Sequence, residues 1–154
     1  MECSNGLRKE QIVTNFDVST TEFFHHDKNC AKESFRFRTT GQIAFNDDHP
    51  NWINFTFAST ELTVFVSEVI ADFNKRSVCG FTNWIAAEAK VITGLKCALF
   101  NYNKDTQIPR VGDLKYGIYS VDNERLFYGQ MTQEKDGSSA GKRPNSYSLE
   151  FLIR

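Results

Sequence analysis

Apolar and polar residues alternate one by one over several stretches of this 154-residue chain, and this feature limits its fold more than any other. Successive side chains of a β-strand point to opposite faces, so such alternation indicates strands with one buried face. The clearest stretches are SFRFR (34–38), WINFTF (52–57), ELTVFVS (61–67) and SYSLEFLIR (146–154). Further strands are predicted near residues 12–17, 20–26, 69–75, 90–100, 114–121 and 125–131.

The connections between these stretches are short and rich in turn-forming residues, so we expect successive strands to pair in an up-and-down order. Examples are FNDDHPN (45–51), NYNKDTQIPRVGD (101–113) and the hairpin tip Asp122-Asn123. At most one short helix is expected, near 82–89. No repeat or linker divides the chain, so residues 1–154 are expected to form one domain. The predicted class is all-β and mainly antiparallel, either a sandwich or, as we favour, a single closed or nearly closed up-and-down β-barrel.

Composition and charge exclude several classes of protein. The net charge is -1 and the pI is about 6.3, so no strong field attracts nucleic acid or an anionic membrane. No apolar run reaches the roughly 18 residues of a membrane-spanning helix. The 14 phenylalanines, 5 tyrosines and 2 tryptophans favour strands and an aromatic interior. In SFRFR (34–38), alternation places the phenylalanines inside and the arginines in water, which argues against a stacking platform for nucleic acid.

Four cysteines predict either two disulfides in an exported protein or four reduced, buried thiols in a cytosolic core. They form no Cys-x-x-Cys pair, which argues against a zinc site. We favour the bridges Cys3–Cys30 and Cys79–Cys97, because each then encloses a local strand-rich segment. The N-terminal stretch MECSNGLRKEQ has no apolar signal-peptide core, so export requires that a signal has been removed. The predicted location is therefore secreted or periplasmic.

The stretch KDGSSAGKRP (135–144) is similar to a phosphate-binding loop in composition but not in spacing. Gly137 and Gly141 are separated by three residues, whereas a phosphate-binding loop needs four. Arg143 follows Lys142 in place of the Ser or Thr that would bind magnesium, and no helix pattern follows. We therefore expect a polar connection before the last strand, with both glycines free to adopt positive φ.

No other motif predicts a catalytic or metal site. Adjacent strand residues face opposite ways, so His25 and His26 cannot easily share a metal, and solvated histidines are expected there and at His49. No nucleophile elbow or recognised catalytic cysteine is present. We expect no metal and no cofactor. An enzyme without a recognisable motif stays open, because catalytic groups can assemble from distant positions.

Several segments stand in a recurring order: DKNC (27–30), SFRFRTTGQI (34–43), CGFTNW (79–84), ITGLKC (92–97) and YGIYSVDNERLFYG (116–129) followed by DGSS and KRP. In this order they resemble a family of small exported, disulfide-containing bacterial β-barrel proteins of unknown function. The resemblance spans the chain from about residue 16 onwards. It implies export, disulfides and a barrel-like fold, but no known activity. A more distant analogy is to lipocalin-like barrels, or calycins, and to the lipid-binding barrels of secreted Wnt-inhibitor proteins.

A barrel of about eight strands is either filled by side chains or holds one small ligand. Interior aromatic residues favour a small hydrophobic ligand, so we predict an exported binding protein without catalytic activity. The side chains predicted to line its cavity are Phe55, Phe57, Val64, Val66, Tyr116, Ile118, Leu149 and Phe151.

The alternative is a protein-interaction or inhibitor module that acts through loops 45–52 and 131–145. Its predicted anchors are Trp52, Lys142 and Arg143, because Trp and Arg are frequent among interface hot spots. Neither interpretation includes a nucleic-acid partner or a membrane span.

Overall fold

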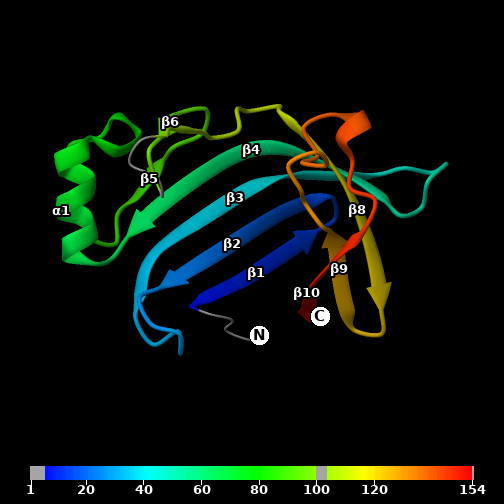
Figure 1. Cartoon of the computed structure of the whole chain (residues 1–154), viewed down its shortest axis with the longest axis horizontal. Coiled ribbons are helices and arrows are strands. Elements are labelled where there is room, and N and C mark those ends of the chain that lie inside the picture. Colours follow the sequence, from blue (N-terminus) through cyan, green and yellow to red (C-terminus); the bar gives the residue numbers. More distant parts are fainter. Residues whose placement is uncertain (1–5, 100–103, 154) are drawn as a thin grey trace.

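The structure, a computed structural model, describes residues 6–99 and 104–153, and a large antiparallel sheet dominates it (Figure 1). Seven strands follow one another in the order β1-β2-β3-β4-β8-β9-β10, and β5 pairs with β4. Strands β6 and β7 form a separate two-stranded sheet. The strands are β1 (Leu7–Thr14), β2 (Asp17–His25), β3 (Glu33–Phe45), β4 (Trp52–Val64), β5 (Ala89–Val91), β6 (Lys96–Cys97), β7 (Thr106–Gln107), β8 (Leu114–Asp122), β9 (Arg125–Gly129) and β10 (Tyr147–Ile153).

Alternation predicted most of these strands but divided one of them. The stretches 52–57 and 61–67, expected as separate strands, belong largely to the single strand β4. A bulge at Ala58 interrupts its pairing with β3, because Thr40 pairs with Ser59 whereas Gly41 pairs with Phe57. The extra residue reverses the alternation, so that odd-numbered residues before the bulge and even-numbered residues after it share one face.

The segment predicted as a strand near 69–75 is instead the helix α1 (Ser67–Arg76). Val66, Val69, Ile70 and Phe73 recur at the spacing of one helical face, and this pattern competes with the β-branched residues that favour a strand. The helix predicted near 82–89 is also wrong, since residues 82–88 are irregular and Ala87 has a φ of 61°. There Trp84 packs edge-on against Phe73, which holds this segment on the core.

The first hairpin turns earlier than predicted. Its strands were expected near 12–17 and 20–26, but β1 ends at Thr14 and β2 begins at Asp17. Asn15 adopts a φ of 57°, a left-handed conformation that Asn tolerates better than most residues, and so it sets the turn there.

The sheet curls strongly but is not closed into a barrel, so the predicted closure is not found (Figure 1). β1 and β10 are its two edges, and neither pairs with the other along the described chain. Two predicted strands, near 69–75 and 90–100, became α1 and the short strands β5 and β6. The described residues therefore form fewer full-length strands than a ring of about eight would require.

One face of the sheet, here called the inner face, carries the core. Strand register places Phe35, Phe37, Leu62 and Val64 on it, and α1 and buried side chains from residues 78–97 and Ile108 pack against them. The buried core comprises Leu62, Val64, Phe73, Val78, Cys79, Trp84, Ile92, Cys97 and Ile108. Phe35 and Phe37 thus face the core as predicted. Arg36, expected in water, is half-buried on the opposite, outer face, with its guanidinium over the rings of Phe23 and Phe65.

Candidate functional site

An apolar pocket of about 330 Å³ lies between α1 and the inner face of the sheet. Strands β3 and β4 supply Phe35, Phe37 and Leu62, and α1 supplies Val69 and Phe73. The wall is completed by Leu99 and by the polar residues Glu68, Asp72 and Arg76. We call this cavity the inner-face pocket.

Helical spacing explains how α1 presents both apolar and charged groups to this pocket. Val69 and Phe73 are four residues apart, and so are Glu68, Asp72 and Arg76 in series, so each set forms a row along the helix. The two rows are adjacent, which places a charged rim beside an apolar wall. A small molecule with an apolar body fits such a lining.

Arg76 organises the rim. Its Nε and Nη2 atoms donate to Asp72 Oδ2 at 2.9 and 2.6 Å, and its Nη1 donates to the backbone oxygen of Ala98 at 2.7 Å. The bond from Arg76 holds the pKa of Asp72 below its ordinary value, so this pair stays ionised at neutral pH. Hydrogen bonds from its own backbone N–H and from the Ser67 hydroxyl also lower the pKa of Glu68.

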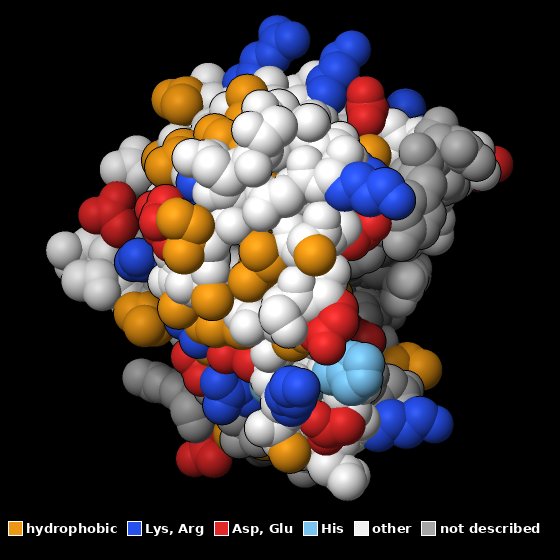
Figure 2. Space-filling view, turned by 90° about the vertical axis from the view of Figure 1, so that its left-hand side faces the viewer, with side chains coloured by type: hydrophobic (Ala, Val, Ile, Leu, Met, Phe, Trp, Pro, Cys, Tyr) orange, Lys and Arg blue, Asp and Glu red, His pale blue; other side chains and the backbone are white. Residues whose placement is uncertain are grey.

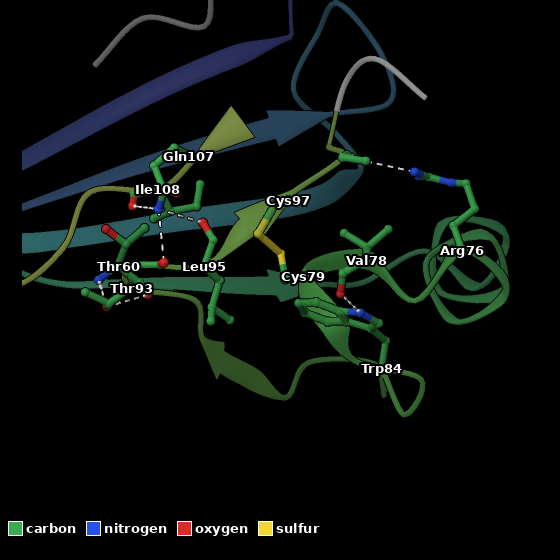
Figure 3. Close-up of a disulfide and its surroundings, with 12 residues drawn as sticks. Thr60, Arg76, Val78, Cys79, Trp84, Thr93, Leu95, Cys97, Gln107 and Ile108 are labelled. Carbon is green, nitrogen blue, oxygen red and sulfur yellow. Dashed lines mark hydrogen bonds between the residues drawn. A yellow bond between two sulfur atoms is a disulfide. The ribbon is translucent and has the colours of Figure 1, made fainter. Parts of the chain in front are cut away.

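The disulfide Cys79–Cys97 holds the far wall in position (Figure 3). It ties the 3-10 turn Val78–Gly80 to β6, the strand that leads to Ala98 and Leu99. The Trp84 indole supports this turn by donating from Nε1 to the Val78 oxygen at 3.2 Å (Figure 3). The predicted Cys79–Cys97 pairing is confirmed. Cys30 is also disulfide-bonded, but Cys3 lies outside the described residues, so the Cys3–Cys30 bridge stays a prediction.

The side chains predicted to form one ligand cavity are distributed over different parts of the molecule. Phe55 and Phe57 pack edge-on at 4.6 Å on the inner face, and Val64 and Val66 are buried in the chain interior. Tyr116 and Ile118 lie on the outer face, whereas Leu149 and Phe151 are exposed on the edge strand β10, Leu149 by 94%. Within the described lining of the inner-face pocket none of these eight occurs.

The sequence reasoning missed Val69 and Phe73 because it assigned residues 69–75 to a strand, and it did not select Phe35, Phe37 or Leu62 as ligand-binding residues although it predicted strands there. The signal that could have found Val69 and Phe73 is the spacing of apolar residues at Val66, Val69, Ile70 and Phe73, which has the period of a helix.

Of the three residues predicted as anchors for a partner, Trp52 and Arg143 contact each other within the chain. Arg143 is buried, donates to the backbone oxygens of Ile53 (3.2 Å) and Gly117, and donates to Asn54 Oδ1 at 2.8 Å. Its guanidinium lies 4.3 Å from the centre of the Trp52 ring, and this ring also stacks on His49 with the ring centres 3.8 Å apart. This arrangement uses the Arg143 guanidinium to hold the loop on the sheet.

The loop that carries Arg143 also covers an edge of β8. The Tyr116 N–H donates to the oxygen of Gly137, which has the predicted positive φ of 71° and no room for a Cβ beside the Tyr116 oxygen. The expectation for Gly141 is wrong, because it lies inside the 3-10 turn Ala140–Lys142 without a positive φ. Lys142 remains exposed, 3.7 Å from Asp136.

No group of three or more potential metal ligands occurs among residues 6–99 and 104–153. The Asp27 side chain stabilises the turn that follows it, because its carboxylate accepts hydrogen bonds from the N–H groups of Asn29, Ala31 and Lys32. These bonds hold the pKa of Asp27 below its ordinary value.

A second depression, of about 480 Å³, lies near the turn at Val111 and Gly112. About half of the residues that line it are polar, among them Asp17, Thr40 and Gln42. Viewed from the α1 end, the surface shows hydrophobic side chains in patches among polar atoms, with charged side chains around them (Figure 2). No described helix is both long and apolar enough to cross a membrane.

No protein-family model matches this chain, and no curated protein matches it with significant similarity. The assignment of a function therefore depends on the geometry alone.

Proposed function

We propose that this protein binds a small, largely apolar molecule in the inner-face pocket. The observation that carries the proposal is a cavity of about 330 Å³ with six apolar side chains in its lining. This volume lies at the lower end of the range of roughly 300–1,000 Å³ for small-molecule sites, so the ligand is small. The same class of ligand followed from the aromatic composition, although the pocket is built from other residues.

We also propose that the curled sheet is a barrel left open along the β1–β10 side, and that the protein functions outside the cytosol. Tyr128 on β9 donates a hydrogen bond to Gln11 on β1, so the sheet curls far enough for the strand beside one edge to contact the strand at the other edge. The Cys79–Cys97 disulfide supports export, because such bonds persist in oxidising compartments.

A neutral fluorescent probe tests the binding proposal. N-phenylnaphthylamine gains fluorescence in an apolar site, and we expect saturable binding to the wild-type protein. Val69→Trp places a large ring inside the inner-face pocket and should weaken binding at least tenfold. The matched control is Val111→Trp, because Val111 is exposed at the second depression.

The two variants separate the possible sites. Loss of binding in Val69→Trp with retention in Val111→Trp supports the inner-face pocket. The reverse result assigns binding to the second depression, and equal binding by both variants rejects a defined pocket. Circular dichroism verifies that both variants remain folded.

A further inference from the structure

The second depression opens on the outer face of the sheet, whereas the inner-face pocket lies on the other side. Thr40 and Gln42 follow Arg36 by four and six residues on β3, so they share its outer face. Their register partners on β2, Ser19 and Asp17, extend them into two polar rows, and both rows line the depression. Its floor is therefore a sheet surface of hydroxyl, amide and carboxylate groups.

Backbone hydrogen bonds fix the wall of the depression that Val111 forms. The Gly112 N–H donates to the Phe57 oxygen at 2.8 Å, and the Phe57 N–H donates to the Asp113 oxygen at 3.0 Å. Asp113 Oδ2 accepts from the Arg110 N–H at 2.8 Å and closes the turn. The fold itself holds this wall in place, which lowers the entropic cost of binding a ligand against it.

The polar groups in the depression keep hydrogen-bonding capacity for a ligand. Gln42 Nε2 donates to Asp17 Oδ1 at 3.0 Å, which orients both side chains. Within the described chain, Asp17 Oδ2, Gln42 Oε1 and the Thr40 hydroxyl have no hydrogen-bond partner. The same holds for the hydroxyl of Thr56, the register partner of Gln42 on β4. A ligand with several hydroxyl groups can therefore be held at several points along one row.

The charge and polarity of the lining favour one class of ligand. Its described residues include one carboxylate and no lysine, arginine or histidine, so the lining itself offers an anion no counter-charge. Arg38, two residues before Thr40 on the same face, donates from Nε to Ser19 Oγ at 3.2 Å. Hydroxyl and amide groups, which both donate and accept, match the hydroxyls of a sugar. Ile12 and Val111, which are 65% and 74% exposed, supply apolar contacts for the C–H face of a sugar ring.

We propose that the second depression binds a neutral saccharide. Asp17 accepts hydrogen bonds from the sugar hydroxyls, and Gln42 and Thr56 bond to the neighbouring hydroxyls along the same row. The volume of about 480 Å³ lies within the range of small-molecule sites. Because the sheet separates this site from the inner-face pocket, saccharide binding does not depend on the proposed function.

Three neutral hexasaccharides, xylohexaose, cellohexaose and maltohexaose, test this site by nuclear magnetic resonance of the isotope-labelled protein. We expect at least one of them to shift the amide signals of Ser19, Thr40 and Gly112 in a saturable manner. Thr56→Val removes one hydroxyl at nearly constant volume and should weaken that saccharide about three- to tenfold. The matched control is Thr63→Val, because Thr63 also lies on the outer face of β4 but outside the depression.

The charge of the ligand gives a second comparison. Hexagalacturonate is anionic and should bind more weakly than the neutral saccharide, and Asp17→Asn should narrow this difference. Val69→Trp, which fills the inner-face pocket, should leave saccharide binding unchanged.

The proposal is overturned if no hexasaccharide shifts these amide signals, if hexagalacturonate binds best, or if Thr56→Val and Thr63→Val weaken binding equally. N-phenylnaphthylamine binding is measured separately, so failure of the saccharide site leaves the inner-face pocket standing. Loss of probe binding likewise leaves the saccharide site standing.

Discussion

Adjacent residues in the loop between β9 and β10 have opposite environments, which a sequence motif does not reveal. Lys142 is exposed, whereas Arg143 is only 8% exposed and is bonded to β4 and β8. The sequence showed that KDGSSAGKRP fails as a phosphate-binding loop, and it predicted the positive φ of Gly137. It could not show that Arg143 folds back onto Trp52, because that contact joins positions 91 residues apart in the chain.

Replacement of Arg143 should therefore destabilise the protein. Arg143→Ala removes the hydrogen bonds that the guanidinium donates to the oxygens of Ile53 and Gly117, and it removes the guanidinium from the Trp52 ring. We expect a loss of about 2–4 kcal/mol in the free energy of unfolding, measured by urea denaturation. Lys142→Ala is the matched control and should change stability by less than about 0.5 kcal/mol. Equal effects of the two substitutions would contradict the assigned role of Arg143.

Asp27 should make stability depend on acid pH. Its N–H donors, chiefly those of Ala31 and Lys32, depress its pKa below the ordinary 3.8 in the folded state. Asp27 therefore stabilises the protein above pH 3.8, and this contribution disappears as the pH falls through the lower folded-state pKa. Urea midpoints should fall less between about pH 7 and about pH 2.5 in Asp27→Asn than in the wild type. Asp47→Asn, in an exposed loop, should follow the wild type.

At the level of elements, periodicity predicted the strands well where pairing is regular and failed where two patterns compete. Alternation at 34–38 and 52–57 correctly indicated strands, because one face of each meets the core. It could not reveal the Ala58 bulge, which brings Phe57 and Leu62 onto one face although they differ in parity. It also placed a strand on α1, so the pocket-wall residues Val69 and Phe73 were missing from the predicted site.

The disulfide is the element that we expect to link stability to binding. Cys79 and Cys97 are separated by 18 positions, and cross-linking a loop of this size stabilises a protein by roughly 3 kcal/mol. The double substitution Cys79→Ala/Cys97→Ala should lower the free energy of unfolding by about this amount. It should also weaken N-phenylnaphthylamine binding, because the strand that leads to Leu99 is no longer tied. Unchanged binding in a still-folded variant would show that the bridge does not position the pocket.

At the scale of the whole molecule, the main property is a strongly curled sheet with two unpaired edges. A predominantly antiparallel fold followed from the sequence, but closure did not, because closure depends on how many full-length strands form. The curvature has a chemical consequence. It brings Tyr128 of β9 to Gln11 of β1, although β9 and β1 are not neighbouring strands in the sheet.

The Tyr128–Gln11 hydrogen bond should hold the curled form together. Burial raises the pKa of Tyr128, so its hydroxyl stays protonated and donates at neutral pH. Tyr128→Phe should cost about 1 kcal/mol and should accelerate amide hydrogen exchange in β1 more than in the central strand β3. Tyr119→Phe is the matched control, since Tyr119 is the register partner of Tyr128 and its hydroxyl makes no hydrogen bond within the described chain.

If the amide hydrogens of β1 exchange at equal rates in both variants, the hydrogen bond does not hold β1 to β9, and strand twist alone accounts for the curl. If the amide hydrogens of β1 exchange faster only in Tyr128→Phe, the Tyr128–Gln11 hydrogen bond keeps β1 close to β9.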